Sequence, residues 1–314
     1  PYRRQRQMCI RDRYTTVQGG KDTTPTNDYL QKKKRYTDYN SINLYGTYDF
    51  SLGNHQFKIM AGFNQESSYQ ETMEALSYGQ AVIEVPSLGS GTSTLKATDK
   101  YNEFSVRGGF FRVNYNYQDK YLLELNGRYD GSSVLADGHK WSFFPSAALG
   151  WRIDQEDFMK DISWINQLKL RFGLGTTGNS AVSAYSTLGN IQSFYVPFGS
   201  TLTPAYATNE PYYTSSQVKM ANKNLGWEKT TQYNYGIDFS FLNGRISGSM
   251  DIYHSNTNDL LLSMTIPTLT GFNSTYANVG KTKNFGVDLS LNLVPIQTKD
   301  FEWSSTINAA YQKD

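Results

Sequence analysis

The sequence of 314 residues is poor in several features that define common classes of protein. It has one cysteine, Cys9, so it can form neither an internal disulfide framework nor a cysteine-based metal site. It has no run of about 18 apolar residues, which excludes a transmembrane helix. A membrane-spanning strand is not excluded, because it needs only about 9–11 residues of alternating character. The formal net charge of +2 is too small to indicate binding to nucleic acid or acidic lipid.

Hydrophobic residues are also scarce, whereas aromatic residues are abundant. Hydrophobic residues make up 38% of the chain even with tyrosine included, against about 45–50% in ordinary globular domains. The aromatic share is nevertheless 15%, with 24 Tyr and 17 Phe, and the chain has 26 Gly. This composition favours a sheet with one face in contact with water.

The first residues, PYRRQRQMCIRDR, are basic and lack the apolar segment of a secretory signal. They are unlike anything that follows. We therefore interpret residues 1–13 as a non-native artefact or a disordered tail, and base the fold prediction on residues 14–314.

Residues 232–255, QYNYGIDFSFLNGRISGSMDIYHS, show the pattern that dominates the chain. Every second residue is apolar, and the residues between are mostly polar or small. Two such runs flank Asn243-Gly244, which predicts a β-hairpin with a two-residue turn. The alternating positions are Tyr233, Tyr235, Ile237, Phe239, Phe241, Ile246, Gly248, Met250 and Ile252.

The same alternation recurs along the chain and predicts ten strands in total. Only the stretch near 155–166 has weak helical character. Besides the hairpin, the predicted strands lie near 42–50, 57–63, 104–117, 123–129, 143–153, 168–174, 285–293 and 301–311.

The connections between these strands alternate in length. Long segments at 67–100, 131–140, 178–228 and 256–283 are separated by shorter ones at 51–54, 118–120, 155–166, 243–244 and 296–300. If the strands run up and down in order, all long loops lie at one end, as in outer-membrane β-barrels. A soluble β-sandwich also alternates, but its strands average about 5–6 residues and its loops are not sorted by length. The sequence therefore predicts an all-β, antiparallel, up-and-down transmembrane β-barrel.

In such a barrel the apolar face meets lipid and the polar face lines the lumen, because every backbone group is paired within the sheet. Charged residues on the polar face would be costly against lipid and are expected in a lumen. The predicted lumen-facing residues are Glu124, Arg128, Asp130, Lys169 and Arg171.

Several long stretches resemble the SusC/RagA-type TonB-dependent outer-membrane transporters of Bacteroidota. They include FFRVNYNYQDKYLLELNGRYDGSS (110–133), WSFFPSAALGWRIDQEDFM (141–159), LKLRFGLGTTGN (168–179), NKNLGWEKTTQYNYGIDFSFLNGRISGSMDIY (222–253), GFNSTYANVGKTKNFGVDLSLN (271–292) and DFEWSSTIN (300–308). The blocks follow the order found in that family, so the resemblance covers nearly everything after about residue 36.

The resemblance implies a barrel of about 22 strands in the outer membrane of a Gram-negative, Bacteroidota-type cell, with a plug domain inside it. It implies import of an oligosaccharide or a peptide, a SusD-like surface lipoprotein as lid, and energy from the TonB-ExbB-ExbD complex acting on a TonB box. This chain shows no recognisable plug domain, TonB box or barrel-closing strand. We therefore expect residues 14–314 to be a partial barrel domain that forms an open, about ten-stranded sheet within outer-membrane lipid.

Aromatic residues in the long segments are the candidates for substrate contact, because rings stack on sugars or peptide side chains and tyrosine adds a hydroxyl group. Packing of loops against each other or against a lid is the alternative. The candidates are Tyr195, Phe198, Tyr206, Tyr212 and Tyr213 in the longest segment, and Tyr69 and Tyr78 in segment 67–100.

The sequence gives no indication of an enzyme, a cofactor or a metal site. Residues 173–178, GLGTTG, match a dinucleotide-binding pattern, but no helix or acidic partner is expected after them. We interpret these glycines as the point where a strand turns into its loop. His55, His139 and His254 have no metal-ligand spacing. The alternative to an importer is a surface adhesin or glycan-binding β-protein without transport.

Overall fold

A computed structural model of the chain describes residues 13–16, 29–79, 87–91, 95–188, 192–198, 201–207, 219–270, 272 and 274–314. The chain divides into two compact units. Unit 1 comprises Pro1–Ile42 and Gln65–Val106, and unit 2 comprises Asn43–Asn64 and Arg107–Asp314. Strands β2, β3 and β4 contribute residues to both units.

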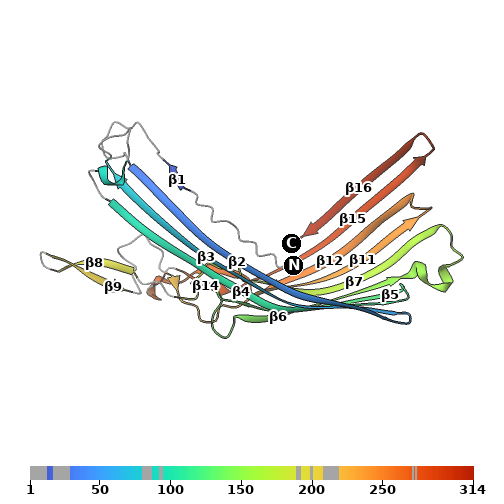
Figure 1. Cartoon of the computed structure of the whole chain (residues 1–314), viewed down its shortest axis with the longest axis horizontal. Coiled ribbons are helices and arrows are strands. Elements are labelled where there is room, and N and C mark those ends of the chain that lie inside the picture. Colours follow the sequence, from blue (N-terminus) through green and yellow to red (C-terminus); the bar gives the residue numbers. More distant parts are fainter. Residues whose placement is uncertain are drawn as a thin grey trace. The chain divides into compact units, whose positions relative to one another are not determined.

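The main sheet has the strand order β1-β2-β3-β4-β5-β6-β7-β11-β12-β15-β16, so its strands follow one another in sequence (Figure 1). Short connections therefore join antiparallel neighbours, as in β11–β12 and β15–β16. The strand bounds are β1 Arg13–Thr16, β2 Tyr29–Leu52, β3 His55–Tyr78, β4 Leu95–Tyr117, β5 Tyr121–Ser132, β6 Trp141–Arg152, β7 Ile165–Asn179, β11 Glu228–Phe241, β12 Ile246–Asn258, β15 Lys281–Gln297 and β16 Glu302–Lys313.

All ten predicted strands are present, and β1 is an additional one. The predicted loop 67–100 was wrong at both ends, because β3 continues to Tyr78 and β4 begins at Leu95. Residues 64–74, NQESSYQETME, are polar on both faces, so they show no hydrophobic alternation although the backbone is extended.

The β11–β12 hairpin differs from its prediction in the turn. Phe241 pairs with Ile246, so the loop has four residues. The backbone N–H of Gly244 donates to the Phe241 carbonyl (3.1 Å), and Leu242 and Asn243 have φ of 54° and 57°. The tight turn is therefore centred on Leu242-Asn243. The prediction was displaced by one residue, because leucine rarely adopts left-handed backbone.

The connections between the main strands carry small elements of their own. Two 3₁₀ helices, η2 Ile153–Gln155 and η3 Asp157–Met159, overlap the first part of the stretch of weak helical character near 155–166. Two further 3₁₀ helices are η1 Leu88–Ser90 and η4 Thr268–Thr270. Strands β8 Gln192–Phe198 and β9 Thr201–Ala207 pair with each other, and β10 Lys219–Met220, β14 Ser274–Asn278 and β13 Leu261–Thr265 form a three-stranded sheet.

In unit 2 the most deeply buried apolar side chains lie in the connections at one end of the sheet. Leu225 and Leu135 are 0% and 1% exposed, and the Ala136 N–H donates to the Leu225 carbonyl (2.9 Å). Asn278 ties two connections together, since its Nδ2 donates to the Gly226 carbonyl (2.9 Å) and its Oδ1 accepts from the Gly226 N–H (2.7 Å). We call this cluster the loop core. It joins connections β5–β6, β7–β11 and β12–β15.

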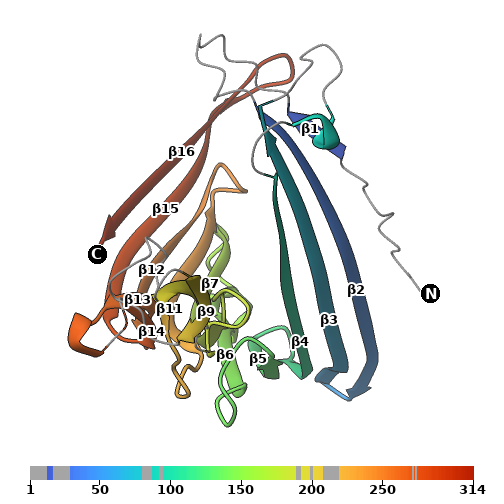
Figure 2. The same cartoon turned by 90° about the vertical axis from the view of Figure 1, so that its left-hand side faces the viewer.

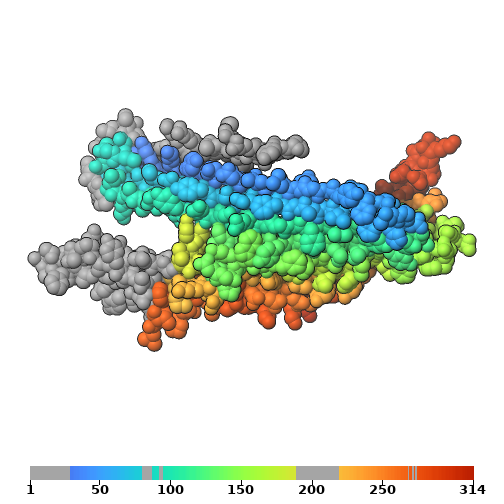
Figure 3. Space-filling view, turned by 60° about the horizontal axis from the view of Figure 1, so that its bottom comes forward, coloured from blue at the N-terminus to red at the C-terminus, as the bar shows by residue number. Residues whose placement is uncertain are grey.

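The strands themselves leave large apolar side chains uncovered. Tyr235 is 55% exposed, Leu149 53% and Leu289 36%. The main-sheet strands of unit 2, coloured green to orange, pack side by side into a continuous surface (Figure 3). They are β5, β6, β7, β11, β12 and β15. Within the described ranges, no helix has the length and apolarity needed to cross a membrane.

The sheet is open at β16. This strand pairs with β15, as Figure 2 shows, and within the described residues it does not pair with β1 or β2. The expectation of an open, about ten-stranded sheet is therefore confirmed.

In unit 1 an aromatic contact and an ion pair join β2 and β3. The rings of Tyr29 and Tyr78 lie 6.1 Å apart between centroids. Lys33 pairs with Glu74 at 3.5 Å, and Leu30 is 1% exposed.

Candidate functional site

The strand register of unit 2 gathers charged residues on one face of the sheet. Arg171 on β7 lies opposite Gly236 on β11, and Gly236 lies opposite Asp251 on β12. Asp251 in turn lies opposite Asp288 on β15. Because residues opposite one another in a sheet point to the same side, these positions form a row. We call this side the polar face.

Arg171 links three strands on the polar face. Its Nε donates to Asp238 Oδ2 (2.9 Å) and its Nη2 donates to Asp251 Oδ2 (2.9 Å). A Cβ at Gly236 would lie 2.6 Å from Arg171 Cζ, inside any real contact distance. Glycine at this position therefore lets the guanidinium cross β11 and reach β12.

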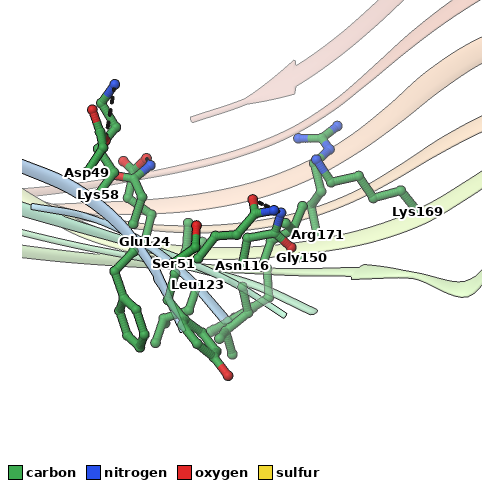
Figure 4. A pocket seen from close by; sticks show the side chains of 18 of the residues that line it. Asp49, Ser51, Lys58, Asn116, Leu123, Glu124, Gly150, Lys169 and Arg171 are labelled. Atoms are coloured by element: carbon green, nitrogen blue, oxygen red, sulfur yellow. Dashed lines mark hydrogen bonds and ion pairs between the residues drawn. The ribbon is translucent and has the colours of Figure 1, made fainter. Parts of the chain in front are cut away.

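A hollow of about 850 Å³ lies on the polar face beside this network. Asp49 and Lys58, which pair at 3.7 Å, lie on one side of it, and Lys169 and Arg171 lie on the other (Figure 4). Small residues from β6 and β7 line it between them: Ala148, Gly150 and Gly173. The combination leaves room for another chain or a solute between groups of both charges.

A second polar network surrounds Glu124. Its carboxylate accepts from Asn114 Nδ2 (3.0 Å) and Asn126 Nδ2 (2.8 Å). Arg112 Nε donates to Asn126 Oδ1 (2.6 Å) and lies 3.8 Å from Glu124 Oε1. The carboxylate is therefore held in place by three side chains on the polar face.

Arg128 and Asp130 form a bidentate ion pair along β5, with Nε and Nη2 each 3.0 Å from a carboxylate oxygen. The structure thus engages Glu124, Arg128, Asp130 and Arg171 in polar contacts, and Lys169 lines the hollow. That this face lines a lumen stays a prediction.

The predicted substrate-contacting aromatics are mostly beyond what the structure describes. Tyr195 and Phe198 lie in β8 and Tyr206 in β9, whose side chains are outside the described set. Tyr212 and Tyr213 lie outside the described residues.

Tyr69 and Tyr78 belong to strand β3, not to a loop. The Tyr69 ring lies 6.5 Å from that of Tyr36 and 6.3 Å from that of Tyr101, all within unit 1. Their role in substrate contact stays a prediction.

The sequence analysis missed two phenylalanines that interrupt the polar face. Phe144, 8% exposed, lies opposite Arg128, and its ring packs edge to face on Trp227 at 5.2 Å. Phe110 lies beneath the Arg128 guanidinium, 5.4 Å from it. The signal in the sequence was the doublets Phe110-Phe111 and Phe143-Phe144, since adjacent strand residues point to opposite faces.

Residues 173–178 lie inside β7 and pair with β11 up to the pair Asn179↔Glu228. The interpretation that the glycines turn the strand into its loop was wrong, because the strand continues through them. In the described part of the chain, no cluster of His, Cys, Asp and Glu could hold a metal ion.

Glu156 organises the connection between β6 and β7. It accepts from Tyr121 Oη (2.7 Å) and Trp151 Nε1 (3.0 Å), and pairs with Lys120 at 3.3 Å. The hydrogen bonds from Tyr121 and Trp151 hold the pKa of the Glu156 carboxyl below its ordinary value.

The model of the family described as "TonB dependent receptor-like, beta-barrel" matches residues 2–314. The chain belongs to this family. Its ordered, antiparallel strands and its polar face are the features of the fold that the sequence resemblance implied.

Curated relatives agree with this assignment. The chain is 38% identical over 278 residues to TonB-dependent receptor SusC of Bacteroides thetaiotaomicron, which covers 86% of this chain and 26% of that protein. It is 35% identical over 276 residues to TonB-dependent receptor P26 of Formosa agariphila, covering 85% of this chain. The predicted SusC/RagA-type resemblance is confirmed. The chain spans about a quarter of the length of these relatives.

Solved structures give the same result. The chain superposes on a chain of the RagAB peptide transporter with a TM-score of 0.80 and 26% identity, covering 93% of this chain and 31% of that one. It also matches the copper transporter OprC with a TM-score of 0.52 at 14% identity, a likeness of fold alone.

Proposed function

We propose that the whole protein containing this chain is a TonB-dependent importer in the outer membrane of a Gram-negative cell. The observation that carries the proposal is the two-faced sheet of unit 2, in which exposed Tyr235, Leu149 and Leu289 stand opposite a face of paired charges. In lipid, an apolar outer face with all backbone groups paired between strands is the stable arrangement for a barrel. The polar face then lines the lumen.

The paired charges on the polar face are suited to a lumen surface that contacts other parts of the protein or a solute. Arg171 offsets one of the two carboxylates of Asp238 and Asp251, so this network presents polar groups with only a small net charge. Among the residues that the structure describes, no arrangement of side chains on this face supports catalysis, and the matching family is described as receptor-like. We propose transport without chemical change of the substrate.

The names of the relatives guide the proposal for partners and substrate. One similar solved structure is that of the RagAB peptide transporter, and one similar curated protein is SusC. We propose an oligosaccharide or a peptide as nutrient, a SusD-like surface lipoprotein as lid, and energisation by TonB-ExbB-ExbD through parts of the protein outside this chain.

Two measurements in the source bacterium test the proposal. The intact protein should fractionate with outer membranes and change its apparent mass on unboiled gels, as folded β-barrels do. Deletion of its gene, or of tonB, should abolish growth on one oligosaccharide or peptide mixture as sole carbon source. Growth without the gene, combined with lost adhesion to a glycan surface, would instead identify an adhesin. Recovery of the intact protein in the soluble periplasm would contradict the barrel.

A further inference from the structure

A second hollow on the polar face, of about 530 Å³, differs in chemistry from the first. It lies where β5 and β7 end and β6 begins, at the end of the sheet that carries the loop core. Its volume is within the usual range for small-ligand sites. The residues that give it its character are Phe110, Arg112, Arg128, Asp130, Phe144 and Trp227.

Three aromatic rings make one part of the hollow apolar. Phe144 packs on Trp227, and Trp227 is fixed by its Nε1, which donates to the Lys140 carbonyl (2.8 Å). Phe110 lies under the Arg128 guanidinium at 5.4 Å. These contacts hold the rings in place, and together they form an apolar side of the hollow against which a cyclic or aromatic ligand group can pack.

Two arginines present unused donors to the same hollow. Arg128 binds Asp130 through Nε and Nη2, and Arg112 binds Asn126 through Nε. Within the described residues, Nη1 of Arg128 and both terminal nitrogens of Arg112 make no hydrogen bond. Both side chains are about half exposed, at 46% and 50%. The charged lining residues are Arg112, Arg128 and Asp130, and Glu124 lies beside the hollow, 3.8 Å from Arg112. The hollow therefore has no excess of positive charge, and its capacity to bind an anion comes from the unused arginine donors.

Asp130 fixes the orientation of Arg128 and binds only its Nε and Nη2. Its side chain is 13% exposed, and a Cβ at Gly108 would lie 1.8 Å from its Oδ1. The glycine thus lets the carboxylate sit against β4. With Asp130 bound to Nε and Nη2, the guanidinium of Arg128 is fixed in orientation, and Nη1 is left as a donor in the lining of the hollow.

We infer that this hollow is a subsite for a carboxylate group attached to a flat or cyclic unit of the transported solute. The inference rests on the proposed import function and specifies its substrate as acidic. A uronate residue of an oligosaccharide and the C-terminus of a peptide both supply this chemistry. Arg112 and Arg128 bind the carboxylate, and Phe144 and Trp227 pack against the adjoining unit.

The test uses the full-length protein in detergent and isothermal titration with two matched pairs of ligands. One pair is trigalacturonate and neutral trigalactose. The other is a peptide with a free C-terminus and the same peptide amidated. In at least one pair the acid should bind about tenfold or more tightly, as expected for a charge-assisted hydrogen bond, and the responding pair identifies the source of the carboxylate.

Three variants test whether the preference for the acidic ligand comes from this hollow. Arg112→Gln and Arg128→Lys should each abolish the preference for the acid, and Phe144→Leu should weaken both members of the responding pair. Arg128→Lys keeps a positive charge beside Asp130, which guards against misfolding. Arg245→Gln, in the exposed β11–β12 turn, is the matched control and should change nothing.

Equal binding of acid and neutral ligand in both pairs, or an undiminished preference in Arg112→Gln and Arg128→Lys, would overturn the inference. Growth assays on the same strains keep the two proposals separate. Strains that import their nutrient normally while the protein shows no acid preference would contradict only the subsite. Uptake and growth that are the same with and without the gene would contradict the import function.

Discussion

Adjacent residues on β15 offer a direct test of which face meets lipid. Leu289 is 36% exposed and lies between Met250 and Ala309 on the neighbouring strands, whereas Ser290 points to the polar face beside Ser249. β15 runs from Lys281 to Gln297, so Leu289 is its middle residue. At about 3.4 Å per residue it lies roughly 27 Å from either strand end, or about 20 Å in height at a tilt near 40°.

This position lies near the centre of an apolar band about 25 Å tall. Leu289→Arg should therefore cost about 2–4 kcal/mol in the free energy of folding into lipid. Ser290→Arg changes depth by one residue only and should cost about 0–1 kcal/mol, because its side chain enters a wet, charged environment.

The assay is folding of the full-length protein into lipid vesicles across a urea series, with the folded fraction read from the gel shift of unboiled samples. The difference between the two variants is the informative quantity, since the strand, the substituted side chain and the depth are shared. Equal losses from both substitutions would show that the polar face is packed dry, as in a sandwich, and would refute the assignment of faces.

Three further outcomes are expected. Gly236→Val should lower the free energy of unfolding of the full-length protein by about 2 kcal/mol, because the valine Cβ displaces the Arg171 guanidinium. Gly173→Ala is the control, since the nearest atom to a Cβ there lies at 3.9 Å. Equal effects of the two substitutions would contradict a loss caused by displacing Arg171. Glu156→Gln should lower the melting temperature at pH 7. The difference from the unsubstituted protein should vanish as pH falls through the lowered pKa of Glu156, because a carboxyl group with a lowered pKa stabilises the folded state only while it is ionised. A difference that does not depend on pH would refute this. Asn278→Ala should remove three hydrogen bonds and so cost about 2–3 kcal/mol of local stability. Proteolysis of connection 259–280 should then be faster while the gel shift stays the same. An unchanged rate of cleavage would refute the role of Asn278 in the loop core.

The parts of the fold predicted from the sequence are those governed by the two-residue period. Strands such as β5, β7 and β15 were evident because apolar residues alternate along them. The outer ends of β3 and β4 were not, because polar residues on both faces leave no period to detect. The Leu242-Asn243 turn was missed since only tertiary context places leucine in left-handed backbone.

The candidate site was predictable in residue type and face but not in contacts. The alternation of side chains along a strand was enough to place Glu124, Arg128 and Arg171 on the polar face. That Arg171 reaches Asp251 across Gly236 depends on the register of three strands, which pattern alone does not give. The packing of Phe144 could not be predicted from its strand alone, because its partner Trp227 comes from connection β7–β11.

The loop core has a consequence for how this protein can vary. Loops that stand alone can change length and sequence independently, but Leu135, Leu225 and Asn278 share one small interior across three connections. A substitution in one connection therefore alters the selection on the other two. Diversification of these connections should proceed as a set, with the three positions changing together among descendants. The turn at 242–245, at the opposite end, takes no part in the loop core and should change independently of them.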